Sequence, residues 1–442
     1  MRVVIIGGGT AGTETAFQLR KKDKECEILV LEGGKNTLYS PCSLPYVISG
    51  EISHFDSAFV FEERDYKTNG IILILGAKVE KIDRKSKKAI YRFGSEMKEI
   101  FYDLLVIATG SISRVPQING LSGLKYHTLK TVEDAQGIKS EILPGKKALI
   151  IGAGYVGTEL AYALNEAGVN VSLAEAGERV LANSFDRQIG RKVEEKLRER
   201  GITVLTGCAI GEISEGKAVA GDKTIDFDFL VVSGGACANI TLARECGLEV
   251  GSGIKVNENM QTTDENIFAC GDCVECKSFV TGKQIMSQLG STAVRQAAAV
   301  AENLLGGDER FGSVLNASVS KLGELALGST GLTEGRAKAE GIRAVSATFG
   351  GSSRAEYYPG GKPITITLVA DAEGKLIGAQ VAGCEEVLGR INQLSLAISQ
   401  KIGLKELSRS EFAYNPCLSP IHDPVEVCAQ LCEKKRQILP EK

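Results

Sequence analysis

Short apolar runs alternate with helix-like segments along the first two thirds of the chain. Residues 2–6, 28–31, 147–151 and 169–174 are such runs, rich in Val, Ile, Leu and Ala. The segments after residues 2–6 and 147–151 space their apolar residues as a helix does. Apolar strands that alternate with helices are typical of an α/β fold with a buried sheet.

A glycine-rich turn follows the first of these strands. The sequence Gly7-Gly8-Gly9-Thr10-Ala11-Gly12 has the form G-x-G-x-x-G and opens the first predicted helix. In this motif the first glycine makes the turn, the second lets a pyrophosphate approach, and the third lets the helix pack closely. The next predicted strand ends at Glu32, at the distance from Gly12 where the motif places a carboxylate that accepts hydrogen bonds from ribose hydroxyls. We therefore predict a dinucleotide site over Gly7, Gly9, Gly12 and Glu32.

The same pattern returns in the middle of the chain. The turn Gly152-Ala153-Gly154-Tyr155-Val156-Gly157 follows residues 147–151, and Glu175 ends the next strand at a similar distance from Gly157. Two dinucleotide sites indicate two dinucleotides, of which one supplies hydride and the other receives it. Glu175 is expected to repel a 2′-phosphate, which favours NADH over NADPH, whereas nearby Arg179 works against that preference.

The segment from about residue 323 onward carries no nucleotide motif. Strand-like runs at residues 364–368 and 376–379 precede a predicted helix over residues 388–400. We expect this segment to form a separate α+β unit.

Composition limits the class of protein. The 442 residues are 43% hydrophobic and 24% charged, with a formal net charge of −3, which gives no reason to expect a nucleic-acid partner. The apolar run after Arg2 is too short for a signal peptide, and no apolar stretch reaches the ~20 residues that span a bilayer. Twelve scattered cysteines suit a reducing compartment better than a disulfide framework, so we expect a cytoplasmic protein without a membrane partner.

One cysteine lies in a setting that favours reactivity. In Ser40-Pro41-Cys42-Ser43-Leu44-Pro45, the prolines favour a turn followed by a helix that Leu44, Val47 and Ile48 bury. Cys42 would then lie beside a helix N-terminus, where the helix dipole and free amide donors stabilise a thiolate. The alternative is a buried structural cysteine, which is the commoner situation of a lone cysteine.

Together these motifs resemble a known family. Two strands that end in small-residue turns, residues 103–110 and 227–235, and a third strand that leads to Cys270-Gly271-Asp272 occur in the expected order. The chain resembles the pyridine nucleotide-disulfide oxidoreductases, in particular the single-cysteine branch of coenzyme A-disulfide reductase, persulfide reductase, and NADH oxidase and peroxidase. The resemblance implies two Rossmann-like domains and a C-terminal dimerisation domain. The expected boundaries are 1–112 and 246–322 for the FAD-binding domain, 113–245 for the NAD-binding domain, and 323–442 for the dimerisation domain.

The resemblance also implies roles for individual residues. Glu159 matches an acid near the flavin and the nicotinamide, and the helix through residues 291–295 would point its N-terminus at the flavin. Tyr414 matches a family tyrosine that reaches the active cysteine of the partner subunit across a homodimer. Tyr358, of the neighbouring pair Tyr357-Tyr358, is a weaker match to the same tyrosine. The FAD site would comprise Gly7, Gly9, Gly12, Glu32, Thr109, Gly110, Gly271 and Asp272, and the NADH site Gly152, Gly154, Gly157 and Glu175.

Cys42 matches the single redox cysteine of the family, and the next cysteine in the chain is Cys208. The expected enzyme is therefore an FAD-dependent NADH oxidoreductase that reduces coenzyme A disulfide, coenzyme A persulfide or polysulfide through a mixed disulfide at Cys42. One alternative is an NADH oxidase or peroxidase that cycles Cys42 through sulfenic acid. Family members with that activity carry a histidine at the position of Thr10. The absence of this base argues against the oxidase or peroxidase alternative. A flavin-dependent redox sensor is the third interpretation.

Other residues are assigned with open alternatives. Arg20 and Lys22, with Lys21, either bind coenzyme A phosphates or form a solvated basic helix end. Ser43 is expected to contact substrate beside Cys42. Cys270, Cys273 and Cys276 are expected to be structural thiols and not metal ligands, and Cys417 is either a small apolar substitution or a thiol that resolves Cys42 across the dimer.

Overall fold

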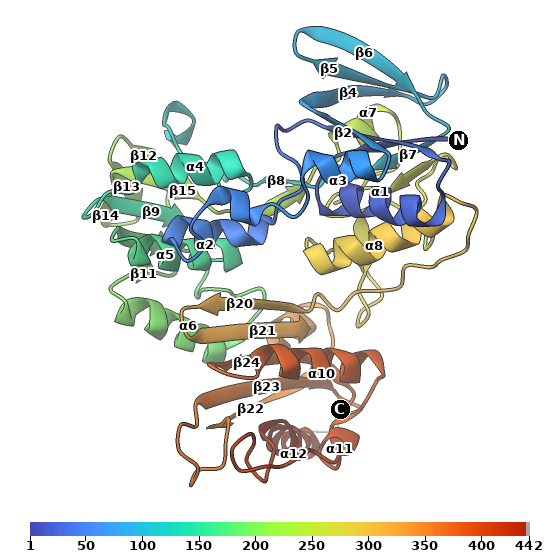
Figure 1. The fold of residues 1–442 in the computed structure, drawn as a ribbon. Helices are drawn as coiled ribbons and strands as arrows, with labels where there is room; N and C mark the ends of the chain where they lie inside the picture. Colours follow the sequence, from blue (N-terminus) through green and yellow to red (C-terminus); the bar gives the residue numbers. More distant parts are fainter. Residues whose placement is uncertain (439–442) are drawn as a thin grey trace.

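The computed structural model describes residues 1–438 and confirms the predicted α/β class. A five-stranded parallel sheet is formed by residues from both ends of the first two thirds of the chain (Figure 1). Its order is β17-β7-β1-β2-β3, and its central strand, β1, pairs Val3 with Ile28 and with Leu104. The strands are β1 (Arg2–Ile6), β2 (Glu27–Glu32), β3 (Ile71–Leu75), β7 (Leu104–Ile107) and β17 (Ile267–Ala269).

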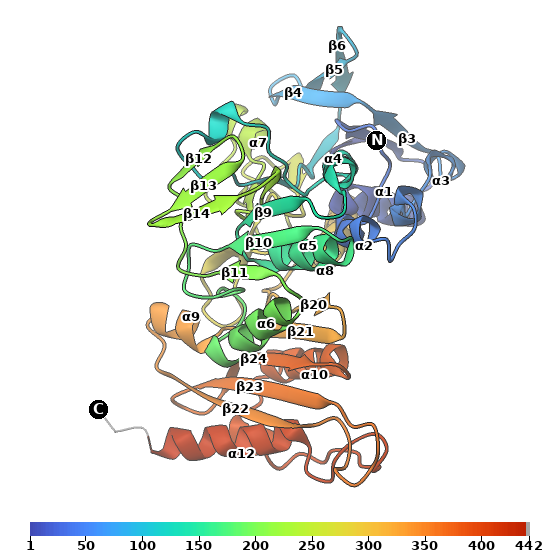
Figure 2. The ribbon, with the colours of Figure 1, turned by 90° about the vertical axis from the view of Figure 1, so that its left-hand side faces the viewer.

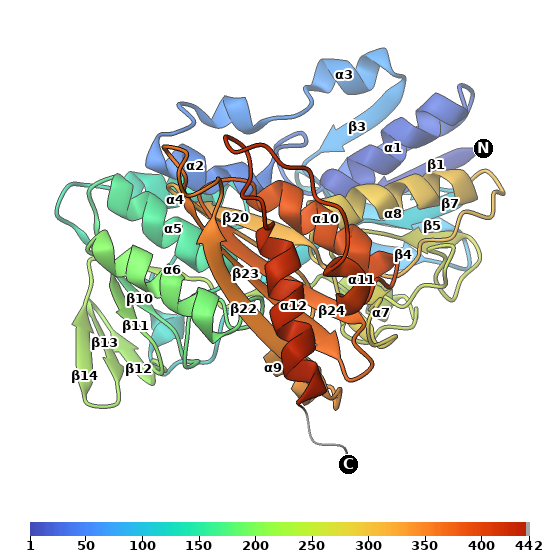
Figure 3. The same ribbon diagram turned by 90° about the horizontal axis from the view of Figure 1, so that it is seen from below.

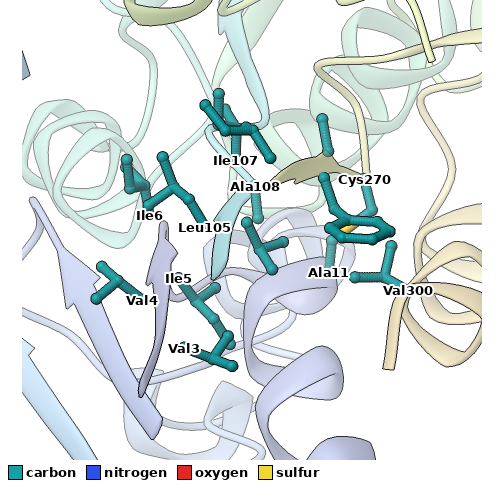
Figure 4. Close-up of a cluster of buried hydrophobic side chains, with 14 of the residues drawn as sticks. Val3, Val4, Ile5, Ile6, Ala11, Leu105, Ile107, Ala108, Cys270 and Val300 are labelled. Carbon is teal, nitrogen blue, oxygen red and sulfur yellow. The ribbon is translucent and has the colours of Figure 1, made fainter. Parts of the chain in front are cut away.

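This sheet is buried because helices cover it. Helices α1 (Thr10–Lys22) and α8 (Gly290–Asn303) pack side by side on it, although the whole middle part of the chain separates them in sequence. Figure 4 shows part of this core, where Ala11 lies near Val300 and the sulfur of Cys270. Helix α3 (Glu63–Thr68) packs on β3. Strands β4 (Ala77–Asp83), β5 (Lys88–Phe93) and β6 (Glu96–Phe101) form a separate antiparallel sheet.

A second parallel sheet forms the middle unit, in the order β11-β10-β9-β15. It consists of β9 (Lys147–Ile151), β10 (Asn170–Ala174), β11 (Thr203–Leu205) and β15 (Phe229–Val232). The helices of this unit are α4 (Val132–Glu141), α5 (Tyr155–Glu166) and α6 (Arg187–Glu199). Helix α7 (Thr241–Glu245) packs instead against β4 and in the core of the first unit. A small antiparallel sheet of β12 (Glu212–Ser214), β13 (Lys217–Ala220) and β14 (Lys223–Asp226) lies beside this second parallel sheet. Where the chain passes between the first and the middle unit, β8 (Ser111–Ser113) pairs with β16 (Ala236–Ala238).

The C-terminal unit is an antiparallel sheet in the order β20-β21-β24-β23-β22 (Figure 2). Its strands are β20 (Ser318–Leu322), β21 (Leu325–Gly331), β22 (Ala344–Ser352), β23 (Pro363–Asp371) and β24 (Leu376–Gly383). Helices α10 (Val387–Ser399) and α12 (Pro424–Gln437) share one apolar core with these strands (Figure 3). Two shorter helices, α9 (Glu334–Ala339) and α11 (Leu404–Leu407), complete the unit. The runs at residues 364–368 and 376–379 therefore lie in strands, as predicted.

The short helix α2 (Leu44–Ser49) connects the units. It follows a 3₁₀ turn over Pro41–Ser43, and Leu44, Val47 and Ile48 are buried as predicted. Leu44 and Ile48 do not join the core of the first sheet. They pack with residues of α4 and α5, in the same cluster as Leu322 of β20. Residues just after Cys42 are therefore fixed by the middle and C-terminal units.

Two buried cysteines in α12 make the C-terminal unit sensitive to alkaline pH. The Cys428 thiol donates to Ala347 O and Ile366 O, and the Cys432 thiol to Val345 O and Leu368 O. Burial raises the pKa of both thiols to about 12. Because the unfolded chain ionises near pH 9 and the folded chain does not, stability is complete below pH 9 and is lost as the pH rises toward 12.

We predict that a variant with Ala in place of both cysteines loses less free energy of unfolding between about pH 7 and about pH 10 than the wild type does. Each thiol accounts for about 1.4 kcal/mol of that loss at pH 10. Urea unfolding of the double variant at both pH values, with Cys237→Ala as an exposed control, measures the difference. An unchanged pH-dependent loss in the double variant would contradict the assignment.

Candidate active site

The two glycine-rich turns have the same geometry. Gly7 has φ +106° and Gly152 has φ +104°, a region that side chains rarely adopt. A Cβ at Gly12 would overlap Gly7 O, and a Cβ at Gly157 would overlap Gly152 O in the same way. Both positions therefore require glycine for the turn and the helix to pack against each other.

The middle glycines of the two turns are open. A Cβ at Gly9 or at Gly154 would meet no atom within 4 Å, and each residue is the N-cap of a helix that no side chain caps. The free N–H donors of α1 and α5 therefore face space that a pyrophosphate fits.

The two strand-end acids, Glu32 and Glu175, are held in matching positions. Glu32 accepts hydrogen bonds from Gly8 N and Gly34 N, and Glu175 accepts from Ala153 N and Gly177 N at 2.8 and 2.7 Å. Each carboxylate thus fixes its own glycine-rich turn. Its remaining lone pairs lie at the turn, where they are available to a ribose.

A second polar cluster lies where β7, β8 and β17 end. Asp272 accepts from Ser111 Oγ at 2.8 Å, and Lys130 Nζ lies 2.6 Å from Ser111 Oγ and 3.4 Å from Asp272 Oδ2. Nearby, Thr109 Oγ1 donates to Asn239 O at 2.7 Å, and Gly110 and Gly271 adopt φ +65° and +85°. The predicted flavin residues of this region therefore meet at the carboxyl end of the first sheet.

Cys42 is an exposed thiol in the 3₁₀ turn directly before α2. Ser43 Oγ donates to Ser40 O at 2.7 Å and closes this turn. Ser43, which the sequence suggested as a substrate contact, therefore already uses its hydroxyl proton within the turn. The prediction that Cys42 precedes a helix N-terminus is confirmed.

The predicted stabilisation of the Cys42 thiolate is wrong for the protein alone. Desolvation by the surrounding protein is the largest influence and raises the pKa of the thiol. The negative charges of Glu159 and Asp272 raise this pKa further, and among the described residues only Lys130 lowers it. A thiolate at this position therefore needs an additional favourable charge or hydrogen bond that the described residues do not supply.

Glu159 lies on α5, on the side that faces the C-terminal unit. Ser320 Oγ of β20 donates to its carboxylate at 2.6 Å. Burial raises the pKa of Glu159, and the hydrogen bond from Ser320 partly opposes this shift. The negative charge of Glu159 thus acts on Cys42. The implied place of Glu159 near the flavin and the nicotinamide stays a prediction.

Lys130, Ser111, Ser320 and Tyr46 are site residues that the sequence analysis missed. Lys130 is the positive neighbour that lowers the pKa of Cys42, and the phenol of Tyr46 interacts electrostatically with both Cys42 and Glu159. Tyr46 follows Cys42 by four positions in a helical segment, a spacing that places two side chains on one face. That spacing could have placed Tyr46 near Cys42 from the sequence alone. No local sequence pattern identifies Lys130 or Ser320 as neighbours of the site.

Two tyrosines of the C-terminal unit, Tyr357 and Tyr414, form a pair. Tyr357 and Tyr414 hydroxyls lie 2.6 Å apart and are exposed, whereas Tyr358 has no side-chain bond to Tyr414 among the described residues. Figures 1 and 2 show the β22–β23 connection, which carries Tyr357, at the end of this unit far from α2. Within one chain the pair therefore does not lie beside Cys42.

The assignment of Arg20 to phosphate binding is wrong. Its guanidinium is buried and donates to the carbonyls of Asp23, Lys24, Cys26 and Gly70. Arg20 therefore ties the end of α1 to the start of β2. Lys22 remains accessible and pairs with Glu302 at 2.5 Å.

The cysteines after β17 are buried and contact protein groups. Gln296 Nε2 donates to Cys276 Sγ at 3.1 Å, and the Cys273 thiol donates to Cys270 O at 3.2 Å. Burial raises the pKa of Cys270 to about 12 and that of Cys273 and Cys276 to about 11. These properties are those of neutral structural thiols. Cys417 is half-buried and bonds to its neighbour Asn415 at 2.9 Å.

The fold and the site define a flavin- and pyridine-nucleotide-dependent oxidoreductase, and comparison with protein families agrees. Residues 1–298 match the pyridine nucleotide-disulphide oxidoreductase family, and residues 319–423 match the dimerisation domain of that family. The chain belongs to this family. Membership implies FAD and NAD(P)H as cofactors, and the open turns at Gly9 and Gly154 fit both groups.

Relatives with different activities are similar to the chain. It is 38% identical to an NADH oxidase of Methanocaldococcus jannaschii, over 98% of this chain and 99% of the relative. It is 32% identical to an NAD(P)H coenzyme A polysulfide/persulfide reductase of Pyrococcus horikoshii, over 97% and 98%. Among solved structures, an NAD-dependent persulfide reductase of A. fulgidus is 34% identical, with a TM-score of 0.95 and coverage of 99% of this chain and 84% of that one.

Within residues 1–438, no helix has the length and apolar character that crossing a membrane requires.

The matching geometry of Gly12 and Gly157 allows a paired test of the two dinucleotide sites. We predict that Gly12→Ala purifies with little FAD, because a Cβ there displaces Gly7 O from the turn. Gly157→Ala is its matched control: it should keep FAD and lose pyridine-nucleotide binding. Flavin absorbance per protein and titration with NADH measure the two effects. Equal FAD content in both variants would contradict the division of sites.

Proposed function

We propose that the protein is an NADH-dependent reductase of disulfides, persulfides or polysulfides that acts through Cys42. The observation that carries this proposal is an exposed thiol at a helix start with no second thiol beside it among the described residues. All twelve cysteines are free, and no other cysteine is among the groups that shift the pKa of Cys42. The sulfur that exchanges with Cys42 therefore comes from a substrate or from another subunit.

The proposed chemistry is thiol–disulfide exchange. Bound FAD supplies two-electron transfer from NADH to the cysteine. The Cys42 thiolate attacks one sulfur of an S–S bond, forms a new S–S bond to it, and releases the other sulfur as a thiolate that takes up a proton. Two electrons and one further proton then break the new bond, which regenerates the Cys42 thiolate and releases the second sulfur as a thiol.

Residues around Cys42 have separate proposed roles. Lys130 opposes the negative charges of Glu159 and Asp272 and so favours the thiolate. Glu159 has a raised pKa and is suited to hold a proton near the sulfur. A tyrosine of the pair Tyr357–Tyr414 would approach Cys42 of the partner subunit and protonate the leaving sulfur.

A homodimer would make that approach possible. The dimerisation-domain match covers residues 319–423, and the same unit exposes Leu388, Leu396, Leu418 and Ile421. Exposed apolar side chains that cluster on one unit are typical of a surface that another subunit covers.

The proposed electron donor is NADH and not NADPH. Glu175 is fixed at the second turn by two amide hydrogen bonds and places a negative charge at the expected position of the ribose. A 2′-phosphate would meet that charge directly.

Coenzyme A derivatives are the proposed carriers of the substrate sulfur. Two considerations support this class: relatives whose names include coenzyme A polysulfide/persulfide reductase, and the accessible basic side chain of Lys22, with Lys21, at the end of α1. Arg20 takes no part in this proposal because its guanidinium is buried and both terminal nitrogens donate to backbone carbonyls.

A second candidate function is NADH oxidation with oxygen as the acceptor. The 38% identity to the NADH oxidase of Methanocaldococcus jannaschii favours it. Thr10 argues against it, because the first glycine turn then lacks a histidine that could act as a base.

We predict that Cys42→Ser abolishes reduction of coenzyme A disulfide and polysulfide, by at least ~10³-fold, while FAD remains bound. Cys237→Ser, which changes another exposed cysteine, is the matched control and should retain activity. NADH consumption with each acceptor under anaerobic conditions measures the effect. Sulfur reduction that persists in Cys42→Ser would eliminate the proposal, and oxygen consumption that exceeds sulfur reduction in the wild type would favour the oxidase.

We also predict that Glu175→Gln raises the ratio of kcat/KM for NADPH to that for NADH by about tenfold, because the repulsive charge is removed. The side-chain length is kept, although the Gln amide can accept from only one of Ala153 N and Gly177 N. Glu32→Gln changes the matching acid of the first turn and should leave the ratio unaltered. Initial rates with both nucleotides test this, and an unchanged ratio in Glu175→Gln would show that Glu175 does not select the nucleotide.

A further inference from the structure

Ser320 links the C-terminal unit to the surroundings of Cys42. It lies in β20, which packs on α5, and its hydroxyl donates to Glu159 Oε1 at 2.6 Å. Because Glu159 belongs to α5 of the middle unit, this bond crosses from one unit to another. Ser320 is only 8% exposed, and within the described residues its hydroxyl makes no other hydrogen bond. The hydroxyl therefore serves a single carboxylate.

The same carboxylate acts on Cys42. Helix α5 packs against α2, the helix that directly follows Cys42 (Figure 1), and apolar residues of the two helices share one core. The negative charge of Glu159 acts on the Cys42 thiol and on the phenol of Tyr46 in α2. Glu159 thus connects the Ser320 hydroxyl, by a hydrogen bond, with the Cys42 thiol, by its charge.

Few other titratable groups take part in this coupling. Strands β9 and β10 also pack on α5, and they contribute apolar side chains to the shared core. Among the described residues, the further titratable groups that act on Cys42, on Glu159 or on their neighbour Tyr46 are Tyr46 itself, Glu51, Lys130 and Asp272. Apart from burial, Ser320 is the influence on the proton affinity of Glu159 itself.

The hydrogen bond from Ser320 favours the ionised form of Glu159. A hydroxyl donates more strongly to a charged carboxylate than to a neutral carboxyl group. Burial raises the pKa of Glu159, and the bond from Ser320 opposes that shift. An ionised Glu159 in turn disfavours a second negative charge on Cys42. Through Glu159, the hydroxyl therefore acts against the Cys42 thiolate.

We propose that Ser320 is a positioning residue whose hydroxyl keeps Glu159 ionised and so restrains the exposed Cys42 thiol from forming its reactive thiolate. This inference rests on the proposed function, because it assigns a control to the same cysteine. The thiolate is the form that attacks S–S bonds and also the form that peroxides oxidise. An exposed cysteine that is held as a thiol is protected from oxidation between turnovers.

The test uses the full-length protein loaded with FAD. Ser320→Ala removes the donor, and Ser320→Thr keeps a hydroxyl. Ser318→Ala is the matched control, because Ser318 lies in the same strand and its hydroxyl bonds to Tyr155, at 3.0 Å, and not to Glu159. The infrared C=O band that Glu159→Gln removes reports the protonation of Glu159 across pH. The rate at which iodoacetamide alkylates Cys42, followed by peptide mass analysis, reports its thiolate.

We expect Ser320→Ala to move the titration of Glu159 toward alkaline pH by about one pH unit. Between the two titration midpoints Glu159 is protonated in the variant and ionised in the wild type, so Cys42 should be alkylated about threefold to tenfold faster in the variant. Outside that interval the two rates should agree. Ser320→Thr and Ser318→Ala should behave as the wild type, and Ser320→Ala should have no effect on alkylation when combined with Glu159→Gln.

Two results would overturn the proposal: an unmoved titration of Glu159 in Ser320→Ala, or an altered alkylation rate that persists when Glu159→Gln is also present. The second result would show a structural effect of Ser320 that does not pass through Glu159. Both measurements run without NADH and without a sulfur substrate. Failure of the Cys42 reductase proposal, which is seen as sulfur reduction that persists in Cys42→Ser, is therefore recognised separately.

Discussion

The burial of α2 is the constraint on which the active site depends. Leu44 and Ile48 are fully or almost fully buried among residues of α4 and α5, although they come from an early part of the chain, between strands of the first sheet. Lys139 of α4 adds a hydrogen bond to Val47 O at 3.0 Å. Burial of each large aliphatic side chain contributes about 1.5–3 kcal/mol. These contacts hold Cys42 at the junction of the units, so the first and second sheets cannot separate without moving the thiol.

The duplicated turns show how one local device serves two sites. In each, two glycines are closed by backbone contacts, the middle glycine is open, and a carboxylate from the next strand holds the turn. This arrangement needs only neighbouring strands of one parallel sheet. The two sites therefore differ through what surrounds them. The first is completed by Asp272, Ser111 and Lys130, and the second adjoins the C-terminal unit through Tyr155 and Glu159.

The sequence predicted features that local patterns encode and missed those that depend on distant contacts. The strands, both glycine turns, their acids and the helix after Cys42 follow from periodicity and from spacing between neighbouring elements. Arg20 lies in a basic run typical of a solvated helix end, but its partners include Gly70, which only the folded sheet brings near. Lys130 and Ser320 reach the site from other units. The partnership of Tyr414 with Tyr357 depends on the loop between β22 and β23, whose course no motif specifies.

The charges around Cys42 link its titration to that of Glu159. Each negative charge raises the energy of the other, and the low polarity that raises the pKa of Glu159 also strengthens this repulsion. A proton on Glu159 therefore favours the Cys42 thiolate, and loss of that proton favours the thiol. Lys130 cannot cancel the coupling, because Asp272 and Ser111 already share its ammonium group. The pKa of Cys42, which desolvation raises most, is thus also raised by an acid that Ser320 of the C-terminal unit holds in place. The domain that is expected to form the dimer therefore also acts on this sulfur within its own chain.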